Sequence, residues 1–211
     1  MEGLVKVVGT GPGHESYLTP IGLETIKQAE ILVGGQRLLD TFAFEGQKQF
    51  TMDKDLEKAV RFINKNRYFK RIVVLASGDT GIYSVANHLA KHIPVNELEF
   101  VPGISSIQLM FARIKKPWNE ATILSMHGCP PDLVVAATVV QHSKITVFLT
   151  GSPWTPQRIA ECLLIEGMAD TKVIVGKDLS YPWEKLVYTT LRALSKDEQD
   201  YSNSVMVIVN E

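Results

Sequence analysis

The chain has 211 residues, a formal net charge of −1 at pH 7, 45% hydrophobic residues and 21% charged residues. These values are typical of a globular protein, and the small charge gives no general attraction to nucleic acid or to an anionic membrane. Cys129 and Cys162 lie far apart in the sequence, which argues against a zinc site and a secreted disulfide scaffold. No apolar run approaches the roughly 18 residues of a membrane span, and the N-terminus has no signal-peptide pattern. We therefore expect a cytoplasmic protein with no nucleic-acid or membrane partner and no resident metal ion.

The first half of the chain alternates predicted strands with predicted helices. A helix is expected from Thr19-Pro20, which supplies an N-cap and a proline at the first helical position. This order predicts a mainly parallel sheet with helices on its faces. The strands are expected at residues 4–8, 31–33, 49–51 (an edge), 72–76 and 98–101, and the other helices at 36–39, 55–65, 82–93 and from about 106 to 114.

The second half begins after a break at Lys115–Asn119. Its last two predicted strands follow one another without a helix, and such strands usually pair antiparallel, so we expect a mixed sheet. The fold class is α/β with two α/β domains, residues 1–116 and 117–211. Strands are expected at residues 122–125, 145–149, 172–175, 186–190 and 205–209, and helices at 133–141 and 156–166, with no helix after them.

The strand predicted at residues 72–76 ends in a loop that is a candidate ligand site. Its run Ile-Val-Val-Leu-Ala suits a strand buried on both faces, and Ser77-Gly-Asp-Thr-Gly81 follows directly. In open α/β sheets, ligands bind beyond the carboxyl ends of the strands. The simpler alternative is a tight turn in which Asp79 caps the next helix.

Other known site types fit the sequence less well. The run Gly9-x-Gly11-x-Gly13 misses the dinucleotide fingerprint because His14 stands where a glycine is needed and the next helix starts too late. No phosphate-binding P-loop, G-x-S-x-G motif or H-E-x-x-H motif occurs. His88 and His92 are four residues apart on a predicted helix, but no third ligand is in view, which favours a solvated helix face. His127 follows a strand and is a weak candidate for contact with a substrate or for catalysis.

Three loop segments, each after a predicted strand, resemble the tetrapyrrole methylase family. They are Val8-Gly-Thr-Gly-Pro-Gly13, Ala76-Ser-Gly-Asp-Thr-Gly-Ile-Tyr83 and Val101-Pro-Gly-Ile-Ser-Ser106. The resemblance implies an S-adenosylmethionine-dependent methyltransferase of corrin or porphyrin precursors. It also implies a homodimer and two α/β domains with the methyl donor in the cleft between them. Excess valines at 134, 135, 139 and 140 agree with a dimer.

Within the family, the sequence is most similar to members that methylate C5 of cobalt-precorrin-7 in cobalamin synthesis. Segments 33–39, 124–128 and 179–182 carry this likeness along the chain. The chain departs from the pattern at His14, where Asp is common, at Thr80, where Pro is usual, and at Cys129, where a basic residue is expected. The cobalt belongs to the substrate, so the lack of a metal motif does not conflict with this resemblance.

The resemblance also implies site residues, and it leaves the proton acceptor unidentified. Rim cations would bind the macrocycle's carboxylates. The implied donor contacts are Gly11, Gly78, Asp79, Ile82, Ser105, Ser106, Leu149, Leu179 and Ser204, and the candidate rim cations are Arg37, Arg113, Lys116 and Arg158.

The alternatives are methylation of another ring position, a nicotinamide-dependent oxidoreductase and a nucleotide-binding regulatory module. The last predicted strand is followed only by Asn210 and Glu211. We therefore expect methylation of C5 without decarboxylation, with a separate enzyme for decarboxylation and C15 methylation.

Overall fold

The computed structural model describes residues 3–53, 55–126 and 131–210. The chain divides into two compact units, Met1–Ser105 and Ser106–Glu211. The boundary expected after residue 116 therefore falls one helix too late. Helix α5 (Ser106–Ile114) belongs to the second unit, where Sδ of Met110 lies beside Gly176.

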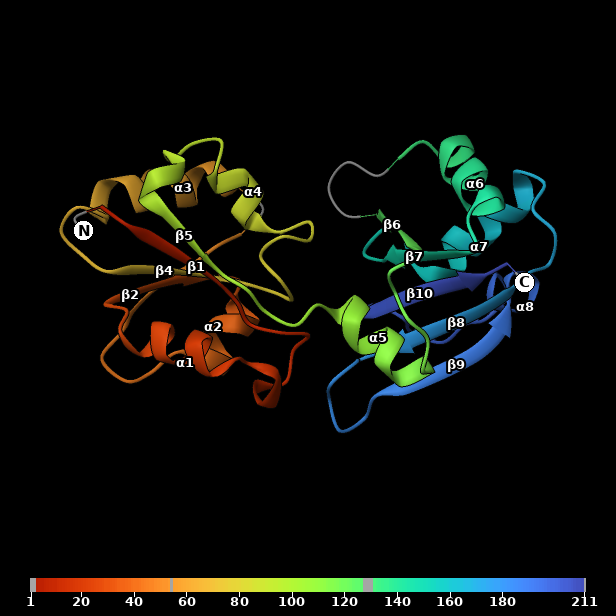
Figure 1. The fold of residues 1–211 in the computed structure, drawn as a ribbon, viewed down its shortest axis with the longest axis horizontal. Coiled ribbons are helices and arrows are strands. Elements are labelled where there is room, and N and C mark those ends of the chain that lie inside the picture. Colours follow the sequence, from red (N-terminus) through yellow and green to blue (C-terminus); the bar gives the residue numbers. More distant parts are fainter. Residues whose placement is uncertain (1–2, 54, 127–130, 211) are drawn as a thin grey trace. The chain divides into compact units, whose positions relative to one another are not determined.

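The first unit contains a five-stranded sheet in which every pairing is parallel (Figure 1). The order β3-β2-β4-β1-β5 places β3 at an edge, as the sequence predicts. The central strand β4 is buried along its whole length, which explains its unbroken apolar sequence. The strands are β1 (Val5–Gly9), β2 (Ile31–Gly34), β3 (Lys48–Thr51), β4 (Ile72–Ala76) and β5 (Leu98–Val101).

Helices cover both faces of this sheet. Helices α3 (Leu56–Asn66) and α4 (Val85–Leu89) pack on one face in a core that includes Val74 and Ile63. Helices α1 (Pro20–Lys27) and α2 (Gln36–Phe42) pack on the other face, in a core that includes Leu75. Figure 1 shows the two helix pairs on opposite sides of the strands. Two short 3-10 helices, η1 (Glu15–Tyr17) and η2 (Val95–Glu97), lie in connections.

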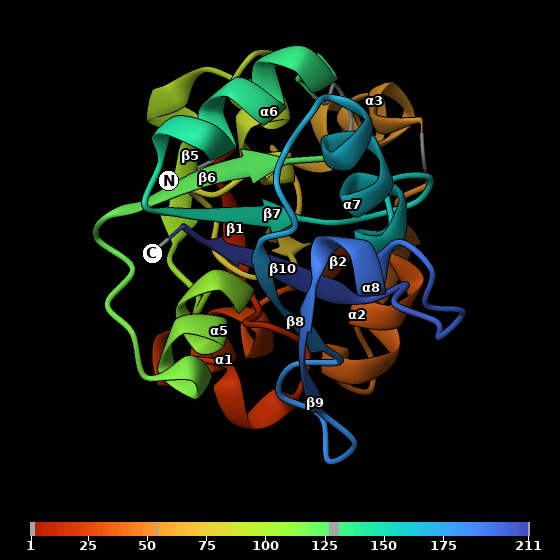
Figure 2. The same ribbon diagram turned by 90° about the vertical axis from the view of Figure 1, so that its right-hand side faces the viewer.

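The second unit contains a mixed five-stranded sheet of order β6-β7-β10-β8-β9 (Figure 2). Strands β6 and β7 are parallel, and the other three pairings are antiparallel, so the predicted mixed sheet is confirmed. The last two strands do not pair with each other as expected, because β10 lies between β7 and β8. The strands are β6 (Ala121–Ser125), β7 (Ile145–Leu149), β8 (Lys172–Lys177), β9 (Lys185–Thr190) and β10 (Ser204–Val209).

In the described part of the second unit, helices lie on both faces of this sheet. Helices α6 (Leu133–His142), α7 (Pro156–Ile165) and α8 (Leu191–Leu194) contribute to one core with Phe148 and Val175. A Cβ added to Gly176 would lie 2.6 Å from Sδ of Met110 in α5. Since successive residues of a strand point to opposite faces, α5 covers the other face of the sheet.

Two helix predictions are wrong. The helix expected from residue 82 begins at Val85, because Tyr83 has a left-handed backbone (φ 47°) and Ser84 caps the helix by accepting from the Ala86 amide. It ends at Leu89 rather than continuing to residue 93. Helix α8 was not expected, and its cap is the side chain of Thr190. Within the part of the chain that the structure describes, no helix is long and apolar enough to cross a membrane.

Candidate functional site

Three loops meet, backbone against backbone, at the carboxyl edge of the first sheet. They follow β1, β4 and β5, and each contributes a glycine at the contact. A Cβ added to Gly103 would lie 2.3 Å from the carbonyl oxygen of Gly78, and one added to Gly9 would lie 2.7 Å from the same oxygen. Real Cβ atoms do not come so close to another atom. Only glycine at positions 9 and 103 therefore allows this edge to close.

The loops after β1 and β4 are also joined by hydrogen bonds. The amide of Gly78 donates to the carbonyl of Gly11 at 2.8 Å, and the amide of Gly11 donates to the carbonyl of Gly78 at 3.2 Å. Both residues have positive φ, 84° at Gly11 and 71° at Gly78, a region that favours glycine. A Cβ added to Gly78 would contact only Cα of Ser105, at 3.8 Å. The edge thus leaves open space beside Gly78, as a bound ligand would require, whereas Gly11 is covered by Tyr17, whose carbonyl oxygen would lie 2.9 Å from a Cβ added there.

The carboxylate of Asp79 ties two of these loops together. Its Oδ1 accepts a hydrogen bond from the amide of Gly81 at 2.8 Å, and its Oδ2 accepts one from the amide of Gly103 at 3.0 Å. The alternative in which Asp79 caps the next helix is not what the structure shows, since Ser84 caps α4. Asp79 acts as a brace that fixes the position of the loop after β4 against the loop after β5. The neighbouring Thr80 is buried in this loop.

A cavity of about 390 Å³ opens beside this edge, beyond the ends of β2 and β4. Its lining includes Arg37, one of the candidate rim cations, and Ser77 of the candidate ligand loop, together with Tyr83 and Ser84, which the sequence analysis did not assign to the site. Tyr83 and Ser84 follow this loop and precede the next helix, and this position in the sequence was the available signal. The lining residues are Gly35, Gln36, Arg37, Leu38, Met52, Leu75, Ala76, Ser77, Tyr83, Ser84 and Val85.

The candidate donor contacts divide between the two units. Gly11, Gly78, Asp79, Ile82 and Ser105 belong to the first unit and lie in its carboxyl-edge loops.

Ser106, Leu149, Leu179 and Ser204 belong to the second unit. Leu149 ends β7 and Ser204 begins β10, so antiparallel pairing brings them to one end of that sheet. The hydroxyl of Thr150 donates to the carbonyl of Ser204 at 2.6 Å.

The remaining candidate cations, Arg113, Lys116 and Arg158, belong to the second unit. Arg113 forms a two-point ion pair with Glu184, whose side chain is only 16% exposed. Burial alone would raise the pKa of Glu184, but hydrogen bonds from Arg113 and from the amide of Ser180 lower it below its usual value. The Arg158 guanidinium stacks over the ring of Trp154 at 4.7 Å. Lys116 lies just beyond α5.

His127, the weak catalytic candidate, and Cys129 lie outside the described residues. His14 caps the 3-10 helix η1, where its Nδ1 accepts from the amide of Ser16 at 3.2 Å. The departure from the family pattern at position 14 therefore still provides a capping group.

Comparison with known proteins decides the family. The family model described as tetrapyrrole (corrin/porphyrin) methylases matches residues 5–195. The chain belongs to this family. The three loop segments that suggested the methylases in the sequence are those that form the carboxyl edge of the first sheet.

Two curated relatives match this methylase along nearly its whole length. The cobalt-precorrin-7 C(5)-methyltransferase of Salmonella typhimurium is 30% identical over 208 residues, covering 99% of this chain and 100% of the relative. The probable cobalt-precorrin-7 C(5)-methyltransferase of Methanocaldococcus jannaschii is 28% identical and covers 94% of each chain. A third relative, the decarboxylating precorrin-6Y C(5,15)-methyltransferase of Sinorhizobium sp, is 30% identical over 86% of this methylase but only 44% of its own length.

Solved structures share the fold of this methylase. The precorrin-6Y methylase of Archaeoglobus fulgidus superposes with a TM-score of 0.77 at 18% identity, covering 99% of each chain. The uroporphyrin-III C-methyl transferase of Thermus thermophilus, solved with S-adenosyl homocysteine, superposes with a TM-score of 0.78 at 21% identity, covering 98% of this chain and 97% of that one. The predicted two-domain α/β methylase fold is thereby confirmed.

Proposed function

We propose that this chain is an S-adenosylmethionine-dependent methyltransferase that methylates C5 of cobalt-precorrin-7 in cobalamin synthesis. The observation that carries the proposal is the match to a C(5)-methyltransferase over 99% of this chain and all of that relative. Membership of the methylase family supports the reaction class and the methyl donor. The structure of a neighbour with S-adenosyl homocysteine is compatible with the same donor.

The residues at the carboxyl edge of the first sheet fit this donor. Gly78 has open space beside it, and the hydrogen bond from the Gly103 amide to Asp79 holds the surrounding loops in place. We assign donor contacts to Gly11, Gly78, Asp79, Ile82 and Ser105 in the first unit. In the second unit, the proposed contacts are Ser106, Leu149, Leu179 and Ser204.

The reaction needs little acid–base machinery from the protein. The donor supplies a methyl group on a positively charged sulfur, and the electron-rich C5 carbon of the macrocycle displaces the sulfur in line. The braced loops contribute by fixing the reacting groups, and such positioning can supply ~7–11 kcal/mol of the barrier. Because Asp79 already accepts two backbone hydrogen bonds, its role is to position the loops rather than to remove a proton.

The cavity of about 390 Å³ is our candidate for binding one edge of the macrocycle. Arg37 lies at its lining, and a guanidinium suits the carboxylates on the periphery of such a substrate. Arg113 is less suited to that role because Glu184 already occupies its guanidinium. We therefore place substrate recognition on Arg37 before Arg113, Lys116 or Arg158.

We further propose that this chain does not decarboxylate the substrate. The relatives that match over 94% to 100% of their own length are named as C(5)-methyltransferases, whereas the decarboxylating C(5,15) relative matches over 44% of its own length. A separate enzyme would then carry out decarboxylation and C15 methylation.

We also propose a homodimer, in which α6 lies at the interface. Val134 and Val135 are 58% and 54% exposed on this helix. Val140, which the sequence analysis counted with them, is buried within the unit and contributes nothing to such a surface. The change Val135→Asp is expected to shift the sedimentation coefficient from that of a dimer to that of a monomer. A monomeric wild type at micromolar concentration would contradict the dimer.

Calorimetry with three ligands tests the reaction class. S-adenosylhomocysteine should bind to the purified protein, whereas NADH and ATP should not. Binding of NADH alone would favour the oxidoreductase, and binding of ATP alone would favour a nucleotide-regulated module. Turnover of cobalt-precorrin-7 with a methyl-labelled donor then separates C5 methylation from methylation of another ring position.

A further inference from the structure

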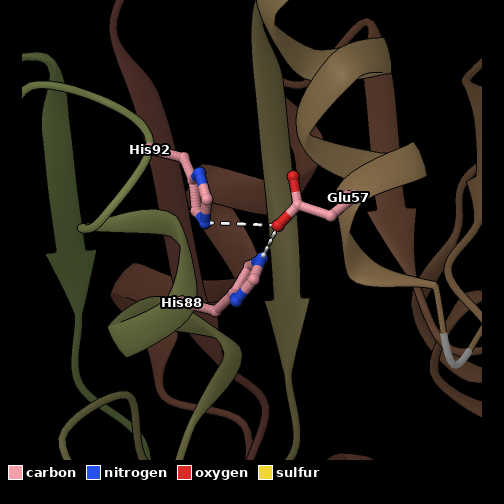
Figure 3. Close-up of side chains that lie close together, drawn as sticks. All are labelled: Glu57, His88 and His92. Carbon is pink, nitrogen blue, oxygen red and sulfur yellow. Dashed lines mark ion pairs between the residues drawn. The ribbon is translucent and has the colours of Figure 1, made fainter.

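Glu57, His88 and His92 form a cluster of metal-ligating side chains outside the candidate methylase site. Nε2 of His88 and Nε2 of His92 each lie 3.3 Å from the same oxygen, Oε1 of Glu57. One ligand atom from each residue lies within 4.8 Å of the others. Figure 3 shows both rings directed at this carboxylate oxygen, with Glu57 reaching them from α3. The sequence supplied the histidine pair but not Glu57, which the fold brings from another helix.

The spacing fits a shared cation better than direct hydrogen bonds. Nitrogen–oxygen hydrogen bonds are usually about 2.7–3.2 Å long, and Nε2 of His88 is buried without a hydrogen-bond partner. Ligand atoms about 2.0–2.1 Å from a tetrahedral zinc ion lie about 3.3–3.4 Å from one another. The two distances of 3.3 Å match the edges of such a tetrahedron.

The local structure holds the three side chains in place. Glu57 lies in the first turn of α3, and His88 lies in the last turn of α4. His92 follows α4 in a turn where its amide donates to the carbonyl of Leu89 at 2.9 Å. The two imidazole rings pack with their centroids 4.6 Å apart. The cluster is therefore built from two helices on the same face of the first sheet.

Two basic side chains of α3 form ion pairs with carboxylates other than Glu57. Lys58 pairs with Asp53 at 3.9 Å, and Arg61 pairs with Asp55 at 3.8 Å. In the described part of the chain, the ion pairs that the structure records for Glu57 are those with the two histidines. This leaves an anionic oxygen and two imidazole nitrogens directed at one point.

We propose that Glu57, His88 and His92 bind a divalent transition-metal ion, with Zn²⁺ as the preferred ion. Two imidazoles and one carboxylate form a ligand set typical of Zn²⁺, and three protein ligands leave the fourth position to water. The ion would join α3 to α4, the helix that follows the cavity-lining residues Tyr83 and Ser84. It is independent of the proposed methyl transfer and of any metal that the macrocycle carries.

Metal titration of the intact protein tests the site. The protein is stripped with a chelator and titrated with ZnCl₂ at pH 7.5 by calorimetry, and separately with CoCl₂ by visible absorption. We expect one strong Zn²⁺ equivalent and a tetrahedral Co²⁺ spectrum that Zn²⁺ abolishes. Saturating Zn²⁺ should also raise the Tm by about 5 °C or more at a hundredfold excess over Kd.

Matched variants test whether the bound Zn²⁺ ion lies at this cluster. His88→Ala, His92→Ala and Glu57→Gln should each weaken Zn²⁺ binding by at least ~10-fold, since losing even an outer-shell partner has an effect of that size. His142→Ala removes a histidine from the end of α6 in the other unit and should leave Zn²⁺ affinity unchanged. Circular dichroism of each stripped variant checks that it is folded.

Three results would overturn the proposal. The first is that the wild type does not bind Zn²⁺. The second is that the folded His88→Ala/His92→Ala double variant binds Zn²⁺ as tightly as the wild type does. The third is that His142→Ala abolishes Zn²⁺ binding. If a variant fails to fold, the Co²⁺ spectrum of the wild type decides: a spectrum of thiolate rather than imidazole and carboxylate ligation rejects the cluster.

Discussion

The substitution Gly103→Ala tests the meeting of the three loops most sharply. The added Cβ would lie 2.3 Å from the carbonyl oxygen of Gly78 and 2.6 Å from the carbonyl carbon of Gly9. Both obstacles are backbone atoms, so no side chain can rotate away. To reach an ordinary contact of 3.4 Å, the loops must separate by about 1 Å.

The contacts at this position set approximate limits on the loss of folding stability that this separation causes. Overpacking by one methyl group costs about 1–3 kcal/mol, and the movement also weakens the hydrogen bond from the Gly103 amide to Asp79. We expect the free energy of unfolding of the first unit to fall by about 2–4 kcal/mol. The unit should remain folded, because domains are typically stable by about 5–15 kcal/mol.

Urea unfolding followed by circular dichroism measures the stability, and calorimetry measures binding of S-adenosylhomocysteine. Gly103→Ala should weaken that binding by ~10-fold or more, because the displaced loops carry the proposed contacts. Gly35→Ala is the stability control, since its Cβ meets nothing within 4 Å and its φ is −62°. A Gly103→Ala protein with wild-type stability and affinity would refute the geometry of this edge.

Three further substitutions test single interactions by urea unfolding. Asp79→Ala should lower the free energy of unfolding by about 2–3 kcal/mol, because it removes both hydrogen bonds to the amides of Gly81 and Gly103. Asp79→Asn should lower it by about 1 kcal/mol, since Asn keeps one acceptor. Equal losses in the two variants would contradict the role of Asp79 as a brace. Arg113→Ala should lower the free energy of unfolding by about 1–2 kcal/mol at pH 7. The pKa of Glu184 in the folded protein is lowered from 4.5, so the difference in unfolding free energy between wild type and Arg113→Ala should persist above pH 4.5. The difference should shrink as the pH falls through the folded pKa of Glu184. A difference that does not depend on pH would count against the ion pair. Tyr201→Phe should lower the free energy of unfolding by about 1 kcal/mol, because the buried hydroxyl donates to Asp197 at 2.9 Å. Burial and this bond raise the pKa of Tyr201 to about 12, so its contribution should be complete below pH 10 and lost as the pH rises towards 12.

The strands were largely predictable from the sequence. Residues 72–76, 98–101 and 145–149 form strands with the predicted bounds. The mixed sheet was predicted, but for a wrong reason, because α8 separates the last two strands and β10 pairs with β7 and β8 instead of β9. A short apolar run bounded by glycine or proline is typical of a strand that is buried in a sheet. Such strands are predictable because the pattern of hydrophobic residues depends directly on which positions are buried. The start of α4 was missed because the left-handed backbone of Tyr83 depends on its surroundings, not on its residue type.

The candidate site was predictable only in part. The motifs located Gly11, Gly78 and Asp79 at strand ends, where the parallel sheet brings them together. The contact between Gly103 and Asp79 joins loops from different strands, and no local pattern reveals it. Glu57 was missed as a partner of His88 for the same reason, since helix spacing shows neighbours on one helix but not on the next.

Analysis of the product made by this protein alone tests the proposed function most directly. The purified chain is incubated with cobalt-precorrin-7 and ¹³C-methyl-labelled S-adenosylmethionine, and the product is analysed by mass spectrometry and carbon NMR. We predict the gain of one labelled methyl group at C5, with no loss of carbon dioxide. Label at another ring position, loss of carbon dioxide or no transfer at all would contradict the assignment as a C5-methyltransferase without decarboxylating activity.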